Sequence, residues 1–328
     1  MRQVLTRASW YAIVFLLVVT LNFFLVRLMP GDPLVHLLGE EGYLYLYVHQ
    51  PQALEEVKAK YGLDKPVVVQ YLTYLGKCLR GDFGWSYQYG QPVFKVIIFR
   101  LKWTLVLLLP AIALSALLGA WLGSLAGWRR GGKREVLSTL LLLFLYSLPT
   151  YCLGMILILL LAYHAGWFPL GGMAGEGKAG LARVGDVLRH LALPLTVLVI
   201  HNTAYNYLIM RNAVAQVKTE DFVLTAAAKG LKEKQVLFRH VLPNALPPLI
   251  NVVALDFGFL LAGALLVEVV FSWQGMGTLI YEAVVSRDYP LLQACFLILT
   301  GGVLLANLAA DLLCAWVDPR IREGESFA

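Results

Sequence analysis

Residues 103–127 read WTLVLLLPAIALSALLGAWLGSLAG, and this run contains no charged side chain. A transmembrane α-helix needs about 20 consecutive, predominantly apolar residues. Five further apolar runs lie near residues 8–28, 136–163, 190–210, 245–272 and 291–316. The sequence therefore predicts an all-α polytopic membrane protein with six transmembrane helices.

The composition agrees with a membrane protein. The chain of 328 residues is 59% hydrophobic and 15% charged, whereas soluble domains carry about 25% charged residues. The net charge of +6 does not indicate nucleic acid as a partner, because most Lys and Arg residues lie in short segments between apolar runs, where they orient a membrane protein. No two of the four cysteines have metal-ligand spacing, so we expect neither a metal site nor a disulfide framework.

The first apolar run could be read as a signal peptide, because Arg2 and Arg7 precede it. The run is longer than the apolar region of a signal peptide, and no small-x-small cleavage pattern follows it. We therefore expect an uncleaved membrane helix over residues 1–28, a separate outer subdomain over residues 29–102, and a core of five membrane helices over residues 103–328.

Positive charge between the runs sets the orientation in the membrane. With the N-terminus inside, the inner segments carry fourteen Lys and Arg residues, and the short outer loops carry four. The inner residues are Arg2, Arg7, Arg129, Arg130, Lys133, Arg134, Arg211, Lys218, Lys229, Lys232, Lys234, Arg239, Arg320 and Arg322, and the outer residues are Lys178, Arg183, Arg189 and Arg287. The pattern predicts an inner-membrane protein with both termini in the cytoplasm.

The outer segment 29–102 has the character of a small soluble subdomain. Residues 51–62 predict a short helix, because Pro51 suits a first helical turn and Gly62 suits a helix stop. Glu56 and Lys60 stand four residues apart and would lie on one helical face.

The inner segment 212–244 is too polar to span a membrane and too regular for a disordered loop. Glu220 and Asp221 suit a first helical turn, the following residues include three consecutive alanines, and Gly230 suits the stop. A second helix is expected near residues 232–241. A thin, alanine-rich helix could seat in a groove of a partner protein, or it could be a solvated connector, and the pattern alone leaves both open.

Several segments together resemble a known family of transporters. The inner loop, Thr225-Ala226-Ala227-Ala228-Lys229-Gly230 followed by Arg239-His240-Val241-Leu242-Pro243-Asn244-Ala245-Leu246-Pro247, resembles the EAA loop of binding-protein-dependent ABC importer permeases. The other segments are Met29-Pro30-Gly31-Asp32-Pro33, Tyr61-Gly62-Leu63-Asp64-Lys65-Pro66, Gln70-Tyr71-Leu72, Leu79-Arg80-Gly81-Asp82-Phe83-Gly84, Val267-Glu268-Val269-Val270-Phe271-Ser272-Trp273, Arg287-Asp288-Tyr289-Pro290-Leu291 and Val317-Asp318-Pro319-Arg320-Ile321-Arg322. Almost end to end, the chain resembles the B-type permease subunit of the dipeptide/oligopeptide/nickel importer family.

This resemblance implies a function and a set of partners. The chain would be the permease subunit of an ATP-driven importer in a bacterial or archaeal cell membrane, and it would form half of the pathway for peptides. Nickel, a metal chelate or an oligosaccharide are the alternative cargoes. The implied partners are a homologous C-type permease, two cytoplasmic ATPase subunits and an extracytoplasmic solute-binding protein.

The resemblance also implies which residues couple the chain to ATP hydrolysis. A coupling helix would dock on an ATPase through Glu220, Asp221, Phe222, Thr225, Ala226, Ala227, Ala228, Lys229 and Gly230. ATP binding would then switch the membrane helices between inward-facing and outward-facing states. The chain departs from the EAA signature at Thr225, where the family has Glu, and from the subgroup's pattern at Asp256, where an uncharged polar residue is usual.

We expect no enzyme activity in this chain and no cofactor bound to it, with ATP and magnesium held by the ATPase partners. Gly172-Met173-Ala174-Gly175-Glu176-Gly177-Lys178-Ala179 comes close to a phosphate-binding loop. It lacks the final Ser or Thr, no strand precedes it, and the charge pattern places it outside the cell. No His-Glu-x-x-His or Gly-x-Ser-x-Gly motif is present.

Polar residues inside the apolar runs are candidates for the transport pathway. A charge at the bilayer centre costs about 2.5–3.5 kcal/mol on insertion scales, so Asp256 suggests a wet or paired site that could contact a cationic group of the substrate. An interhelical hydrogen bond is the alternative role. His201, Asn202, Tyr205 and Asn206 could line a pore or could bridge to a partner permease. Glu268 lies near the outer end of its run, where a charge is cheap.

A stand-alone secondary transporter is the rival class. Such proteins often contain internal repeats and intramembrane charges for ion coupling. The chain shows no convincing repeat, and a secondary transporter has no need for a polar helix pair in one inner loop.

Overall fold

The structure, a computed structural model, describes residues 2–28, 33–61, 64–175, 177 and 179–317. Residues 29–32 and the tail with Arg320 and Arg322 lie outside the described residues, as does Lys178. In chain order the elements are α1 (Arg2–Leu28), α2 (Pro33–His49), α3 (Pro51–Tyr61), α4 (Val67–Leu79), α5 (Val93–Trp128), α6 (Lys133–Ser147), α7 (Thr150–Leu157), η1 (Ile158–His164), α8 (Gly180–Val217), α9 (Asp221–Ala228), α10 (Glu233–Val236), η2 (Leu237–Val241), α11 (Leu242–Val270), α12 (Met276–Val285) and α13 (Tyr289–Val317).

All described elements are helical, apart from an isolated antiparallel bridge between Trp85 and Pro92. By length and composition, four helical segments of the described chain could cross a membrane: Val93–Trp128, Gly180–Val217, Glu233–Val253 and Tyr289–Ala309. The bent pair of α6 with α7 and η1 would be a fifth. This agrees with the expected all-α membrane protein.

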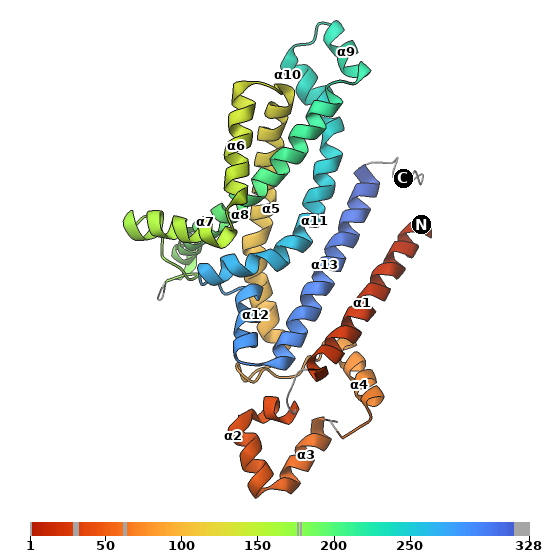
Figure 1. Cartoon of the computed structure of the whole chain (residues 1–328), viewed down its shortest axis with the longest axis vertical. Helices are drawn as coiled ribbons and strands as arrows, with labels where there is room; N and C mark the ends of the chain where they lie inside the picture. Colours follow the sequence, from red (N-terminus) through yellow and green to blue (C-terminus); the bar gives the residue numbers. More distant parts are fainter. Residues whose placement is uncertain (1, 29–32, 62–63, 176, 178, 318–328) are drawn as a thin grey trace. The chain divides into compact units, whose positions relative to one another are not determined.

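The expected single helix over residues 136–163 is wrong, because the structure bends this span by 97° between Ser147 and Thr150. Figure 1 shows α7 running across the end of α6. Pro149 has no backbone N–H to continue a helical ladder, and the residue before a proline avoids the helical region. Leu148 accordingly adopts an extended conformation with φ −76° and ψ 127°.

The chain divides into two compact units. Unit 1 comprises residues 1–102 and 278–304, and unit 2 comprises residues 103–277 and 305–328. The predicted outer segment 29–102 therefore shares a unit with α1, most of α12 and about half of α13.

In unit 2, α5 and α8 meet along a seam of glycines. Gly119, Gly123 and Gly127 stand four residues apart, so they lie on one helical face. A Cβ atom at Gly119 would stand 2.4 Å from Cβ of Asn206, and one at Gly127 would stand 2.5 Å from the Arg211 carbonyl oxygen. Small residues of this kind let membrane helices approach backbone to backbone.

In unit 1, α3 spans Pro51–Tyr61 and begins at Pro51, as the sequence predicts, whereas Gly62, the expected stop, lies outside the described residues. The aromatic side chains of Phe23 and Phe24 from α1 pack on Tyr71 and Tyr74 from α4, with ring centroids 5.2–6.4 Å apart. This packing joins the first helix to the segment that follows it.

The loop between α4 and α5 is tied to the chain about 200 residues later. The Ser86 hydroxyl donates a 2.5 Å hydrogen bond to the buried Asp288 carboxylate, and the Gln88 N–H donates one of 3.2 Å. Tyr89 donates a short hydrogen bond to Glu282, and Arg100 forms a 2.9 Å ion pair with the same carboxylate. Burial and the hydrogen bond to Glu282 raise the pKa of Tyr89 above its usual range.

Candidate functional site

The inner loop folds as the two helices that the sequence predicts. Helix α9 spans Asp221–Ala228, and Gly230 follows it with a φ of +79°, a conformation that glycine adopts without strain. Helix α10 and η2 run from Glu233 to Val241. The Gln235 side chain accepts a hydrogen bond from the Lys232 N–H and so caps α10. Figure 1 shows α9 and α10 at the end of unit 2, beyond the ends of α8 and α11.

The inner face of α9 packs into the chain's own core. Val223 and Ala226 are 4% and 5% exposed. They belong to one hydrophobic cluster with residues of α8, α10, η2 and α11, namely Met210, Val214, Val236, Leu237, Val241, Ala245 and Leu249. Because this cluster joins α9 to both α8 and α11, a displacement of α9 would pull on both helices.

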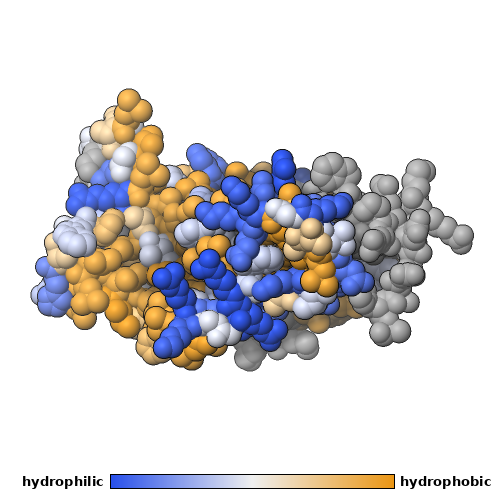
Figure 2. Space-filling view, turned by 90° about the horizontal axis from the view of Figure 1, so that it is seen from above, coloured by the Kyte–Doolittle hydropathy of each residue, from blue (hydrophilic) through white to orange (hydrophobic). Residues whose placement is uncertain are grey.

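The outer face of α9 is exposed. Phe222 and Leu224 are 42% and 63% exposed. The other exposed predicted contact residues are Glu220, Asp221, Thr225, Ala227, Ala228, Lys229 and Gly230. Figure 2 views the molecule from above, and hydrophilic side chains gather near the middle of that view.

The structure separates two predicted contact residues that the sequence treats alike. Ala226 is a core residue of this chain, and Ala228 is exposed. Leu224 was absent from the predicted set, and the structure adds it to the exposed face. The sequence offers one signal for Leu224, which is that it is an apolar residue in a segment too polar to span a membrane.

An ion pair with a buried carboxylate, which the sequence analysis missed, fixes α6 to α8. The Glu135 carboxylate is 5% exposed and accepts a 2.5 Å bond from Arg211. It also accepts hydrogen bonds from the Gly131 N–H at 3.2 Å and the Thr139 hydroxyl at 3.2 Å. Glu135 is the one acidic residue in a strongly basic segment, and its partner lies 76 residues later in the sequence.

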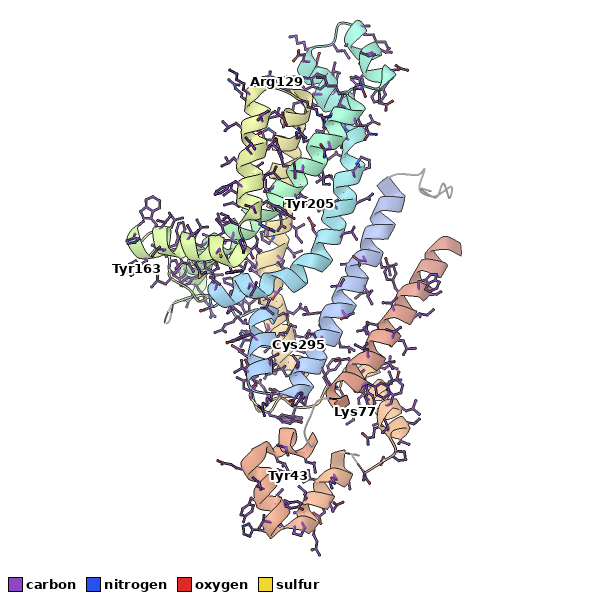
Figure 3. The ribbon with its side chains drawn as sticks, in the orientation of Figure 1. Tyr43, Lys77, Arg129, Tyr163, Tyr205 and Cys295 are labelled. Atoms are coloured by element: carbon purple, nitrogen blue, oxygen red, sulfur yellow. The ribbon has the colours of Figure 1, made fainter. Side chains whose placement is uncertain are left out.

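The polar residues of α8 lie on more than one face of the helix. The His201 ring stacks on Tyr146 of α6 with centroids 4.7 Å apart. Asn206 is fully buried against α5, and its amide nitrogen lies 3.5 Å from the Ser115 hydroxyl. Tyr205, midway along α8 in Figure 3, is 40% exposed.

Four buried polar atoms of α8 have no hydrogen-bond partner within the described part of the chain. They are His201 Nδ1, Asn202 Nδ2, Thr203 Oγ1 and Asn206 Oδ1. A buried polar group without a partner costs about 1–3 kcal/mol. The burial of these atoms within the chain therefore destabilises this stretch of α8.

Asp256 lies on α11 and is partly buried. No hydrogen bond between described residues joins it to the polar residues of α8, so the structure does not bring the predicted pore residues into one bonded cluster. Within the described residues, no group of three or more His, Cys, Asp or Glu side chains could hold a metal ion.

Glu268 corrects the expectation that its charge is cheap. Its side chain is 0% exposed. It accepts a 2.7 Å hydrogen bond from the Thr104 hydroxyl and a 2.6 Å bond from the Gly277 N–H, and Thr104 in turn accepts the Met276 N–H at 2.7 Å. A Cβ atom at Gly275 would stand within 2.1 Å of the carboxylate. Glu268 therefore fastens α5 and α11 to the start of α12.

These features define an all-α membrane protein with a surface helix fixed to the ends of two membrane-crossing helices. Comparison with known proteins identifies its family. The family described as "Binding-protein-dependent transport system inner membrane component" matches residues 119–323, and the corresponding N-terminal family matches residues 1–108. The chain belongs to the binding-protein-dependent transport system inner membrane components.

Named relatives match along nearly their whole length. The di/tripeptide transport system permease protein DppB of Pseudomonas aeruginosa is 36% identical over 93% of this chain and 94% of its own. The oligopeptide transport system permease protein AppB of Bacillus subtilis is 35% identical over 98% and 99%. The dipeptide transport system permease protein DppB of Escherichia coli is 33% identical over 94% and 95%.

Proposed function

We propose that this chain is the permease subunit of an ATP-driven peptide importer and forms half of its translocation pathway. Membership in this family favours a transport component that works with a binding protein over a stand-alone secondary transporter. Peptides are favoured over nickel or oligosaccharides as the cargo, because the named relatives are peptide permeases that match this chain over more than nine tenths of its length.

The proposed topology has six spans and both termini in the cytoplasm. Helix α1 supplies the sixth span, and it contains the apolar stretch Ser9–Phe24. The excess of Lys and Arg on one side supports this orientation. It places α9 and α10 in the cytoplasm and the loop between α4 and α5 outside.

The observation that carries the proposal is the two-sided structure of α9. Its inner residues Val223 and Ala226 are locked into the cluster that holds α8 and α11, whereas Phe222 and Leu224 remain exposed at its surface. Exposed apolar side chains on a rigid helix are typical anchors for a partner protein. An ATPase that grips the outer face would move α8 and α11 as ATP is bound and released.

The polar stretch of α8 supports the proposed assembly with a second permease. The partly exposed His201 and Asn202 and the exposed Tyr205 would contact a homologous C-type subunit or the pathway between the two permeases. Asp256 on α11 remains our proposed contact for a cationic group of the substrate. The solute-binding protein would dock on the outer segments.

The test compares an exposed and a buried position of α9 in the complete transporter. Leu224→Glu should strip the ATPase subunits from the purified complex and leave the thermal stability of the permease unchanged, because Leu224 is 63% exposed and does not belong to the buried cluster around α9. Ala226→Leu should lower the stability of the permease itself, because overpacking a core costs about 1–3 kcal/mol. Leu181→Glu is the matched control, since Leu181 is 90% exposed and lies at the start of α8, whereas α9 follows the end of that helix.

Two measurements decide the outcome. Co-purification reports ATPase binding, and uptake of a dipeptide into proteoliposomes with ATP and the binding protein reports function. If Leu224→Glu keeps its ATPases and its uptake, α9 is not the coupling helix. If the wild-type complex imports the dipeptide without ATP, the proposal of an ATP-driven importer is wrong.

A further inference from the structure

A hollow of about 410 Å³ lies within unit 1, between the end of α4, the loop that follows it and the start of α13. Its wall contains four aromatic side chains, those of Tyr74, Phe83, Trp85 and Tyr87. Pro290, Gln293 and Ala294 form the wall from α13. Small-molecule sites are typically concave, have volumes of about 300–1,000 Å³ and are lined by aromatic residues with a few polar groups. The volume of this hollow lies near the lower end of that range, and its lining agrees with the description.

Two opposite charges, those of Lys77 and Asp82, stand at this hollow. Lys77, labelled in Figure 3, lies in the last turn of α4, and Asp82 follows the end of that helix. Their backbones are adjacent, because the Asp82 N–H donates a 2.9 Å hydrogen bond to the Lys77 carbonyl. Neither side chain forms an ion pair with another described residue, and Asp82 accepts only the Gly84 N–H at 3.1 Å. Both charges are exposed to bind a ligand.

The aromatic wall is held rigidly. Trp85 pairs with Pro92 in an antiparallel bridge, and the Ser86 N–H donates to the Gln91 carbonyl at 3.0 Å. The buried bond from Ser86 to Asp288 anchors the tip of this loop. Trp85 and Tyr87 nevertheless remain 62% and 39% exposed. Binding groups that are fixed before the ligand arrives lose little entropy on binding.

We propose that this hollow is an entry site for a short peptide with free termini, bound before the peptide reaches the membrane pathway. Asp82 and the aromatic faces bind the peptide ammonium group, which is attracted both by a carboxylate and by π-electrons. Lys77 binds the peptide carboxylate. The volume suits about two residues, since a hollow of about 410 Å³ is roughly 7 Å across and an extended chain advances about 3.3–3.6 Å per residue. This inference rests on the proposed importer function and on the outer location of the loop.

The test measures binding of radiolabelled alanylphenylalanine to the complete transporter in lipid nanodiscs, without nucleotide and without the solute-binding protein. Lys77→Met and Asp82→Asn should each weaken binding about tenfold or more, because each removes a charge-assisted contact. Asn at position 82 keeps an oxygen for the Gly84 N–H, so the loop should be preserved. Lys65→Met and Asp64→Asn are the matched controls, because both residues are exposed in the same unit and do not line the hollow.

Modified peptides identify which terminus each residue binds. The N-acetyl peptide lacks the ammonium group, so the wild type should bind it about as weakly as Asp82→Asn binds the free peptide. Asp82→Asn should bind the N-acetyl peptide and the free peptide equally weakly, because the contact that acetylation removes is already absent. The C-terminal amide should show the same relation to Lys77→Met. If the wild type binds no peptide, or if all four variants bind equally, the entry site does not exist.

A separate readout distinguishes this inference from the proposed function. If Lys77→Met and Asp82→Asn bind the peptide normally but lose stimulation of ATPase activity by the solute-binding protein, the hollow is a docking surface for that protein and the inference is wrong. If the wild type shows ATP-driven uptake but its peptide binding does not depend on the peptide termini, the entry site is refuted and the proposed function stands. Absence of ATP-driven uptake overturns the proposed function.

Discussion

Replacing Gly123 with alanine should separate α5 from α8. A Cβ atom at this position would stand 2.6 Å from the Tyr207 carbonyl oxygen and 2.8 Å from Cβ of Met210. Carbon atoms make favourable contacts at about 3.5–4.0 Å, so the two helices must move apart by most of an ångström. Neither neighbouring atom can rotate away, because one is backbone and the other is attached directly to it.

The size of the effect follows from this clash. Overpacking of this kind costs about 1–3 kcal/mol. Gly185 on α8 is the matched control, because a Cβ atom there would meet nothing within 4 Å. Gly185→Ala should be neutral or should stabilise the protein by about 0.5–1 kcal/mol, since alanine loses less backbone freedom than glycine in a helix.

The assay is reversible unfolding of the purified protein in mixed micelles, followed by circular dichroism. Gly123→Ala should unfold at a lower denaturant concentration than the wild type, and Gly185→Ala should not. Gly123→Ala in the complete transporter should also show reduced peptide uptake into proteoliposomes, because α8 carries the polar stretch proposed to meet the second permease. Equal stability of the two variants would refute the close approach of α5 and α8.

Three further perturbations test the buried carboxylates and the bent span. Glu135→Ala should destabilise the protein by about 1.5–3 kcal/mol, because it removes the carboxylate that accepts a hydrogen bond from the partly buried Arg211 guanidinium, and adding Arg211→Ala should restore part of the loss in the same unfolding assay. Glu268→Ala should cost at least 2 kcal/mol, since it removes the acceptor for the Gly277 N–H, and normal stability would show that the carboxylate does not fasten α12. Pro149→Ala should make the helix continuous from α6 into α7. The change should alter the accessibility of Cys152 to a thiol reagent. Unchanged labelling of Cys152 would show that the proline does not cause the bend.

The sequence could predict the helices and the inner loop because their signals are local. The apolar runs, Pro51 at the start of α3 and Gly230 after α9 each act within a few residues. The bend at Pro149 was not predictable in the same way. Pro110 and Pro194 lie inside the continuous helices α5 and α8, so a proline in an apolar run does not by itself identify a break.

The candidate sites were only partly predictable, because burial depends on partners distant in the sequence. The bond from Ser86 to Asp288 joins residues 202 positions apart, and the bond from Thr104 to Glu268 spans 164. Spacing along a helix likewise could not reveal that Ala226 faces inward while Leu224 faces outward. Only the cluster around α9 decides that, and its members come from four other elements.

The contacts of unit 2 also explain how a small surface helix could act on the membrane pathway. Val223 and Ala226 fix α9 to Met210 and Val214 on α8, and the same stretch of α8 is held to α5 by the glycine seam and to α6 by the Glu135 ion pair. A helix fixed on three sides moves with its neighbours as one body and does not bend alone. A displacement of α9 should therefore reach the polar residues of α8 as a shift of the bundle. On this reasoning, variants that loosen the seam should reduce uptake without reducing ATPase binding, whereas variants on the outer face of α9 should reduce both.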